Sequence, residues 1–292
     1  MNVKTSDGRS RSQTTSRRRR LHFVVGVQGD DASLAALRWA ARSARARGAE
    51  LEALMAWALP EPPRHLPGGL REMTDGVVSD LRWALETIVD RSGICAAPGI
   101  SVTTTVATAP VKLALSHAVE RADLLVLGSV QHSVAVAALS ASRQTAASAH
   151  CPVVLVPAGQ PDAVPEVGGD RIVVGMDGSP QSAAALDWAV DEAECRRLPL
   201  SAVSVALTRG SLDVVAGMVA DAMRSHPEVH ITLVTHAGDP GEVLAEESLG
   251  SEALVVGQHG SGSIRRRLPA LGSVSRWCAG HTLSPVVVVP LR

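Results

Sequence analysis

The chain consists of two copies of one sequence unit, and this repeat constrains the possible folds more than any other feature. Segment 24–33 aligns with segment 173–182, so the copies are offset by 149 residues at this point. The same offset relates Trp39 to Trp188, and each copy ends in a Pro-Val-Val run. Such a repeat indicates one domain that occurs twice. The length of 292 residues is sufficient for two domains with separate cores.

The repeat also predicts the domain boundaries. We expect one domain at 21–158 and another at 171–292, joined by a linker at 159–170 that contains several prolines, glycines and acids. Residues 1–20 carry seven basic residues and one acid and are expected to be a disordered tail, either an arm for an anionic partner or a solvated leader. The tail has a formal charge of +6, so the remainder carries −7. This acidic body argues against sequence-specific nucleic-acid binding.

Short β-branched runs alternate with amphipathic segments in both copies. In the second copy, strands are expected near 171–176, 200–206, 229–235, 253–257 and 285–289, and helices from Ser179-Pro180, at 211–225, from Pro240 to about 250 and at 272–281. The first copy has the same order with a longer crossover at 58–98. This alternation is typical of a parallel sheet covered on both faces. The predicted fold is α/β: two tandem copies of a five-stranded parallel open sheet with helices on both faces.

The composition excludes several kinds of catalytic site. Lys4 and Lys112 are the only lysines and neither follows a glycine, so the chain has no P-loop. No HExxH, GxSxG or GxGxxG motif occurs, which removes the signatures of zincins, α/β-hydrolases and ordinary Rossmann domains. No apolar run reaches the roughly 18 residues of a membrane-spanning helix. We therefore expect a cytoplasmic protein whose four scattered cysteines are reduced, buried thiols.

Polar or flexible segments follow the first and fourth strands of the second copy. Asp177 comes directly after the first strand, and Gly257-Gln258-His259-Gly260 follows the fourth. Ligands of open α/β sheets bind beyond the carboxyl ends of the strands, where the strand order reverses. The loop then reaches Gly272-Ser273-Val274-Ser275, where a helix is expected to begin and to offer free N–H groups and hydroxyls. This arrangement predicts a phosphate site that needs no lysine.

These residues resemble the universal stress protein family. The Val-Val-Gly-x-Asp-Gly-Ser opening, the glycine loop and the closing Pro-Val-Val-Val-Val-Pro strand occur in order, and the resemblance extends to both copies. It implies the adenine nucleotide alpha hydrolase-like form of the α/β fold, and ATP as ligand, with or without Mg²⁺. In the family, the aspartate lies beside the nucleoside, a backbone position late in the second strand meets adenine, and the glycine loop and serine hold ribose and phosphates. The implied nucleotide-binding residues are Asp177, Val205, Gly257, Gly260, Gly272, Ser273 and Ser275.

The two copies depart from the family pattern in different ways. In the second copy the spacer 261–271 is two residues longer than the family's nine, which is thermodynamically mild in a surface loop. In the first copy the aspartate and two glycines are replaced, by Gln28, Gln131 and Ala141, while Gly128 and Ser142 remain. A side chain at those positions would obstruct the phosphate and restrict φ. We expect the second copy to bind nucleotide and the first to bind it poorly or not at all.

Other residues of the loop and the repeat have less specific roles. Arg265–Arg267 could clamp phosphates through bidentate contacts or form a solvated loop surface. His259 could act as an acid or base, but no nucleophile or carboxylate is spaced to assist it. Trp39 and Trp188 occupy equal positions in the first helix of each copy, so both are expected to pack in the core.

The valine-rich last strands, 153–156 and 286–289, would be exposed sheet edges unless they are paired. In the family that the chain resembles, this strand pairs across a dimer. The two copies are therefore expected to pair with each other as a pseudo-twofold dimer, and two chains could dimerise further.

The sequence thus predicts a stress-response regulatory protein that binds ATP in its second domain, with a nucleotide-linked change of conformation or oligomeric state. No general base, metal cage or water-positioning pair is recognisable, so ATP hydrolysis should be slow at most. The expected partners are an adenine nucleotide and the chain itself, with no membrane and no specific nucleic acid. Two alternatives remain open: a slow ATPase, and a protein-interaction scaffold that binds no nucleotide.

Overall fold

The computed structural model describes residues 19–58, 70–96, 99–129, 144–158, 171–205, 209–259 and 271–291. The predicted linker and all of the predicted tail except Arg19 and Arg20 lie outside these ranges. In the first copy the elements are β1 (His22–Gly26), α1 (Asp31–Arg47), β2 (Glu50–Ala56), α2 (Leu70–Arg91), η1 (Ile94–Ala96), β3 (Val102–Ala107), α3 (Val111–Arg121), β4 (Leu124–Ser129) and β5 (Val153–Pro157). In the second copy they are β6 (Ile172–Met176), α5 (Pro180–Arg196), β7 (Leu200–Val205), α6 (Arg209–Ser225), β8 (Ile231–His236), α7 (Pro240–Glu247), β9 (Ala253–Gly257), α8 (Ser273–His281) and β10 (Val286–Val289).

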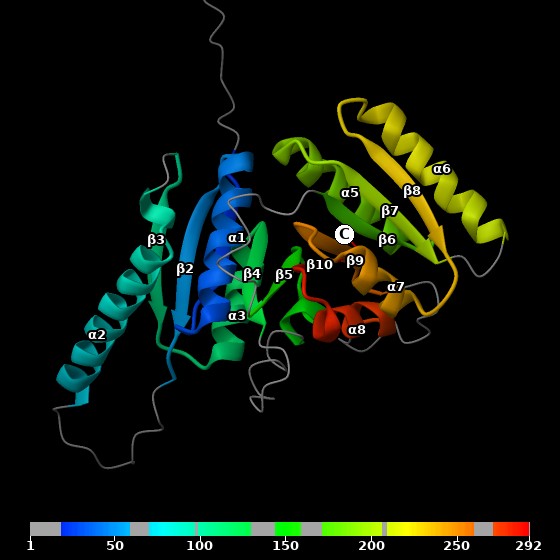
Figure 1. Ribbon diagram of the computed structural model, residues 1–292. Coiled ribbons are helices and arrows are strands. Elements are labelled where there is room, and N and C mark those ends of the chain that lie inside the picture. Colours follow the sequence, from blue (N-terminus) through cyan, green and yellow to red (C-terminus); the bar gives the residue numbers. More distant parts are fainter. Residues whose placement is uncertain are drawn as a thin grey trace, which may run out of the picture.

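The ten strands form one continuous sheet (Figure 1) in the order β3-β2-β1-β4-β5-β10-β9-β6-β7-β8. Within each copy, every neighbouring pair is parallel. The copies meet through β5 and β10, which are antiparallel, with Val287 opposite Val154. The predicted fold class is confirmed, including the pairing of the two last strands within one chain.

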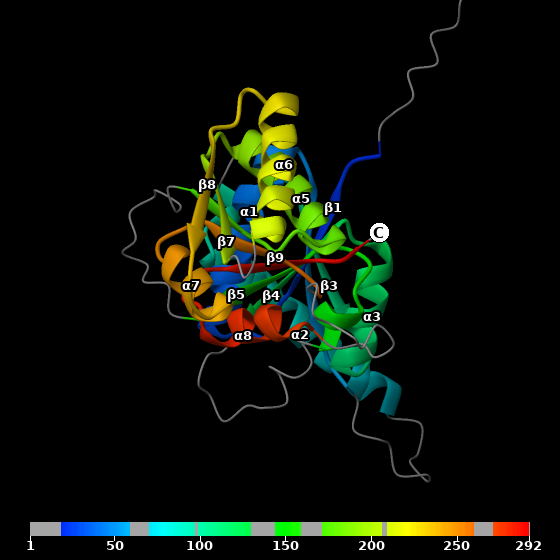
Figure 2. The same ribbon diagram turned by 90° about the vertical axis from the view of Figure 1, so that its right-hand side faces the viewer.

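The apolar core divides by sheet face and not by copy. One buried cluster contains Val25 and Val174 together with residues of α1, α2, α5 and α6. The other contains Val24 and Val173 with residues of α3, α7 and α8. Figure 2 places α5 and α6 on one side of the sheet and α8 on the other. The chain is long enough for two separate cores, but each face has a core that continues across both copies.

Side-chain caps begin the first helix of each copy. The Ser179 hydroxyl accepts a hydrogen bond from the Ser182 N–H, and Pro180 occupies the first helical turn, as the sequence predicts. In the first copy Asp30 caps α1 in the same way, by accepting from the Ser33 N–H. Both helices run back over the sheet and meet where the two copies join.

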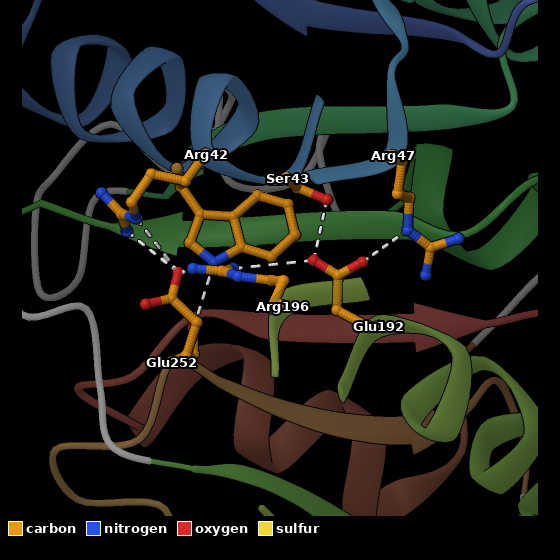
Figure 3. A network of polar contacts seen from close by, with 7 residues as sticks. Arg42, Ser43, Arg47, Glu192, Arg196 and Glu252 are labelled. Atoms are coloured by element: carbon orange, nitrogen blue, oxygen red, sulfur yellow. Dashed lines mark hydrogen bonds and ion pairs between the residues drawn. The ribbon is translucent and has the colours of Figure 1, made fainter. Parts of the chain in front are cut away.

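A buried polar network connects α1 to the second copy (Figure 3). Glu192 is fully buried and accepts hydrogen bonds from the Ser43 hydroxyl (2.8 Å) and Arg47 Nε (2.6 Å). Glu252, 2% exposed, lies 3.0 Å from Arg42 Nη2 and 2.8 Å from Arg196 Nη1. Because each carboxylate is paired with arginine, neither negative charge is buried alone.

The two equivalent tryptophans differ in their surroundings. Trp39 is 1% exposed, and its indole N–H donates to the carbonyl of Glu252 in the other copy at 3.1 Å. Trp188 packs against the same core but is only half-buried, and the Arg47 guanidinium lies 5.3 Å from its ring centre. The core role predicted for both holds fully for Trp39 and in part for Trp188.

The cysteines agree only partly with expectation. All four are free thiols, and Cys151 and Cys278 are buried, but Cys95 and Cys195 are exposed. Cys195 lies near the end of α5, on its exposed side. Burial raises the pKa of the Cys278 thiol to about 12, so it stays protonated at neutral pH.

Candidate functional site

The carboxyl ends of three adjacent strands of the second copy lie at one edge of the sheet. β6 pairs with β7 on one side and with β9 on the other. Asp177 directly follows β6, Val205 is the last residue of β7 and Gly257 is the last residue of β9. The chain leaves β6 toward β7 and returns for β9 on the opposite side, so the strand order reverses here. The structure therefore brings these three sequence-predicted residues to the switch point of the sheet.

Asp177 is exposed at this edge and also shapes the turn into α5. Its Oδ1 accepts a hydrogen bond from the Ser179 N–H at 2.9 Å. The intervening Gly178 has φ +77°, a left-handed conformation that favours glycine. One carboxylate oxygen thus helps to hold the turn, and the side chain remains at the surface where a ligand can reach it.

Gly257 is required by packing, whatever ligand binds nearby. A Cβ on Gly257 would lie 2.9 Å from both the Cβ and the carbonyl oxygen of Gln181 in the first turn of α5. The equivalent Gly128 of the first copy is in the same position, with a Cβ 2.8 Å from the Cβ and carbonyl carbon of Ala32 in α1. The survival of Gly128 in the first copy is explained by this close approach of helix and strand. Gln181 was not identified from the sequence, because nothing in its local pattern marks the contact.

The helix α8 begins at this edge with an open N-terminus. Gly272 is its N-cap residue and has no side chain to cap the helix, and the described residues provide no other side-chain cap. Its first turn therefore presents backbone N–H groups and the positive end of the helix dipole. Ser273 is exposed, whereas Ser275 is buried and donates its hydroxyl to the Gly257 carbonyl at 2.6 Å. Ser275 thus joins α8 to β9, and Ser273 is the exposed hydroxyl of the pair.

The backbone at Gly272 does not require glycine. It has φ −56° and ψ 162°, which any residue can adopt. The expected restriction of φ at the equivalent Ala141 is therefore not supported. The expected obstruction by its Cβ remains a prediction, since Ala141, Gln131 and Ser142 lie outside the described residues. Gln28, which replaces the aspartate, is exposed after β1.

The two ends of the glycine loop are held together. The Gly272 N–H donates to the Gln258 carbonyl at 2.9 Å, and the Gln258 N–H donates to the Val289 carbonyl at 2.9 Å. The extra two residues of the spacer therefore leave the start of α8 beside the end of β9. Gly260 and Arg265–Arg267 lie outside the described residues, so their predicted roles stay predictions.

Gln258 also reaches the other copy. Its side-chain Nε2 donates to the carbonyls of Ala146 (3.0 Å) and Ala147 (2.5 Å), in a short helical segment at 144–148 of the first copy. The sequence identified Gln258 only as part of the loop, and no signal in it pointed to this contact.

Among the described residues, no group of three or more His, Cys, Asp and Glu side chains is placed to hold a metal ion. A hollow of about 460 Å³ lies at the junction of the copies, with Trp188, Arg47 and Asp123 in its wall, and another of about 250 Å³ lies between α5 and α6. Neither is lined by the switch-point residues.

None of the described helices combines the length and apolarity needed to cross a membrane.

Comparison with known proteins agrees with this architecture. A profile of the Universal stress protein family matches residues 20–157, 169–222 and 212–290. Two proteins of Mycobacterium tuberculosis (strain ATCC 25618 / H37Rv), Universal stress protein Rv1996 and Universal stress protein Rv2623, are each 29% identical to this chain. The alignments cover 92% of this chain and 94% and 96% of those proteins.

A solved universal stress protein from Archaeoglobus fulgidus DSM 4304 has a similar fold, with a TM-score of 0.66 and 18% identity over 93% of this chain and 98% of that one. The protein PA1789 from Pseudomonas aeruginosa PAO1 is also similar, with a TM-score of 0.56 and 15% identity over 92% of each chain. The family profile covers both copies, and the strand order of each copy is the same. The chain belongs to the universal stress protein family.

Proposed function

We propose that this chain is a stress-response regulatory protein that binds ATP or a related adenine nucleotide in its second copy. The observation that carries the proposal is the N-terminus of α8 at the switch point of the sheet, which no side chain caps within the described part of the chain. Backbone N–H groups at a helix N-terminus form an anion site without any basic side chain. This suits a chain whose only lysines, Lys4 and Lys112, are absent from the second copy.

Each proposed contact has a partner in the nucleotide. Ser273 would bind phosphate oxygens through its backbone N–H group and its exposed hydroxyl, and Gly272, whose own N–H donates to the Gln258 carbonyl, would let the phosphate approach the helix closely. Asp177, at the end of the adjacent strand, would accept a hydrogen bond from a ribose hydroxyl, and the backbone at Val205 would meet adenine. Ser275 would act by joining α8 to β9, Gly257 by allowing α5 to approach β9 closely, and Gly260 would line the loop. A Mg²⁺ ion, if needed, would arrive with the phosphates.

Binding in one copy provides a way to regulate the whole chain. A nucleotide that favours one conformation or oligomeric state shifts the equilibrium by its difference in affinity for the two states. We do not assign a catalytic residue, and any ATP hydrolysis is expected to be slow.

The proposal is tested by the nucleotide content of protein purified without added ligand. The protein is denatured, the supernatant is separated by ion-exchange chromatography, and stripped protein is titrated with ATP and magnesium. We expect one adenine nucleotide per chain, and binding at least about tenfold weaker in Asp177→Ala, because a hydrogen bond to a charged group is lost.

The chain supplies a matched control. Gln28→Ala changes the exposed residue at the equivalent position of the first copy and should leave binding unchanged. Two nucleotides per chain would mean that the first copy also binds. No binding of any adenine nucleotide would overturn the proposal and favour the scaffold.

A further inference from the structure

We infer that Gln258 is a positioning residue through which the first copy holds the N-terminus of α8 in the second copy. The inference rests on the proposed nucleotide site, because the N-terminus of α8 is where we propose that phosphate binds. Its basis is the contact between the Gln258 side chain and the carbonyls of Ala146 and Ala147, 112 and 111 residues away in the sequence.

The chemistry of this contact is specific. A helix leaves its last carbonyls without intrahelical donors, and Ala146 and Ala147 belong to the short helical segment 144–148. These two residues are only 2% and 7% exposed, so water cannot readily supply the missing donors. Since both partners are acceptors, the NH₂ group of the amide must face them. A single side chain from the second copy thus satisfies the helix end of the first.

The main chain of the same residue joins the two ends of the site. Its N–H donates to the Val289 carbonyl at the end of β10, and its carbonyl accepts from the Gly272 N–H at the start of α8. Gln258 therefore connects three places: the last strand, the open N-terminus of α8 and segment 144–148. A shift of segment 144–148 relative to the second copy would be transmitted to the N–H groups that we propose bind phosphate.

The equivalent residue of the first copy does not make this connection. By the repeat, in which Gly128 matches Gly257, Ser129 is the counterpart of Gln258. Ser129 is 3% exposed, and within the described part of the chain its hydroxyl is buried without a hydrogen-bond partner. Among the described residues, the side-chain contact from this position to the other copy is therefore made by Gln258 and not by Ser129.

The coupling free energy between segment 144–148 and the nucleotide site acts equally in both directions. If segment 144–148 stabilises the loop conformation that binds nucleotide, then bound nucleotide stabilises segment 144–148 by the same free energy.

The experiment compares the full-length chain with Gln258→Ala and with Ser129→Ala, the matched change in the first copy. Gln258→Glu, of nearly the same shape, keeps the packing but cannot donate to the two carbonyls when ionised.

Amide hydrogen exchange without nucleotide is measured first. Gln258→Ala and Gln258→Glu should both speed exchange in 144–150 and in 272–275, whereas Ser129→Ala should speed neither. Unchanged exchange at both places in the Gln258 variants would overturn the inference, whether or not the protein binds nucleotide.

ATP is added next. In the wild type, ATP should slow amide exchange in 144–150. In Gln258→Ala, the dissociation constant for ATP should rise by at least about fivefold, which is the lower end of typical coupling. The slowing of exchange in 144–150 by ATP should also vanish in this variant. A residue with only a structural role would lower the unfolding temperature and leave this response intact, which would also overturn the inference. If the wild type binds no adenine nucleotide, the proposed function fails, and exchange without nucleotide alone decides whether Gln258 links the copies.

Discussion

The packing role of Gly257 can be separated by experiment from its proposed role in the nucleotide site, because the equivalent Gly128 has the same packing in the copy that is not expected to bind nucleotide. A Cβ added at either glycine would lie under 3.0 Å from the first turn of a helix, α5 or α1. We therefore predict that Gly257→Ala and Gly128→Ala each lower the free energy of unfolding by about 1–3 kcal/mol, as overpacking does. Urea unfolding of the purified variants measures this.

Gly217 provides the control, because it lies within α6 and a Cβ added there would have nothing within 4 Å. Gly217→Ala should raise stability by roughly 0.5–1 kcal/mol, since alanine favours a helix. If Gly128→Ala is as stable as the wild type, packing does not explain the glycine. Gly257→Ala could weaken nucleotide binding only because it destabilises the fold. It is evidence for a ligand contact only if the loss of binding free energy is larger than the loss of unfolding free energy.

Among the elements, β2 carries a buried carboxylate with a pH-dependent contribution to stability. Burial alone would raise the pKa of Glu52. Hydrogen bonds from Arg121 and Thr105 and the charges of Arg121 and His22 outweigh this effect, so the pKa of Glu52 is lowered from its ordinary value of 4.5. Arg121 Nη2 lies 2.9 Å from one oxygen and His22 Nε2 lies 3.0 Å from the other. Because the pKa is lower in the folded chain, this stabilisation is present above pH 4.5 and is lost as the pH falls through the folded value.

We predict that Glu52→Gln lowers the free energy of unfolding at pH 7 by about 1.5–3 kcal/mol, the range for hydrogen bonds to charged groups. Its stability should also fall less steeply than that of the wild type below pH 4.5, in urea titrations at a series of pH values. Glu50→Gln, an exposed change on the same strand, should alter stability by less than about 0.5 kcal/mol. Parallel pH curves for the wild type and Glu52→Gln would contradict the assignment.

The elements themselves were largely predictable, and their long-range contacts were not. Residues 253–257 form a strand as predicted, and Ser179 and Pro180 begin α5, because β-branched runs and capping residues act locally. The φ of Gly272 and the packing of Gly257 on Gln181 depend on how helix and strand meet in space. The local sequence does not indicate how closely a helix and a strand approach each other in the folded chain.

For the whole molecule, the repeat predicted the pairing of β5 with β10 but not which side chains lie at the junction. Ser43 and Glu192 are equivalent positions, 149 residues apart, and the structure places them in contact. Equivalent residues can meet only near the pseudo-twofold axis. Trp39 and Trp188 are also equivalent, but Trp39 is only 1% exposed whereas Trp188 is half-buried. The network is asymmetric because the copies have diverged at the residues that face each other.

This asymmetric network predicts how the chain unfolds. Glu192 is fully buried with Ser43 and Arg47 bonded to it, so Glu192→Ala leaves the Arg47 charge without its carboxylate. We expect the free energy of unfolding to fall by about 3–5 kcal/mol, as when one partner of a buried ion pair is removed. The exposed neighbour Asp191→Ala should cost less than about 0.5 kcal/mol.

The shape of the transition tests the same idea. In the wild type, the continuous sheet and the core cluster shared by both copies should make circular dichroism and tryptophan fluorescence report one urea transition. In Glu192→Ala the two signals should separate, because the copies then share less stabilising energy and the weaker one can unfold first. Coincident transitions at an unchanged midpoint would mean that the paired strands alone couple the copies, and that the network between α1 and α5 contributes specificity without stability.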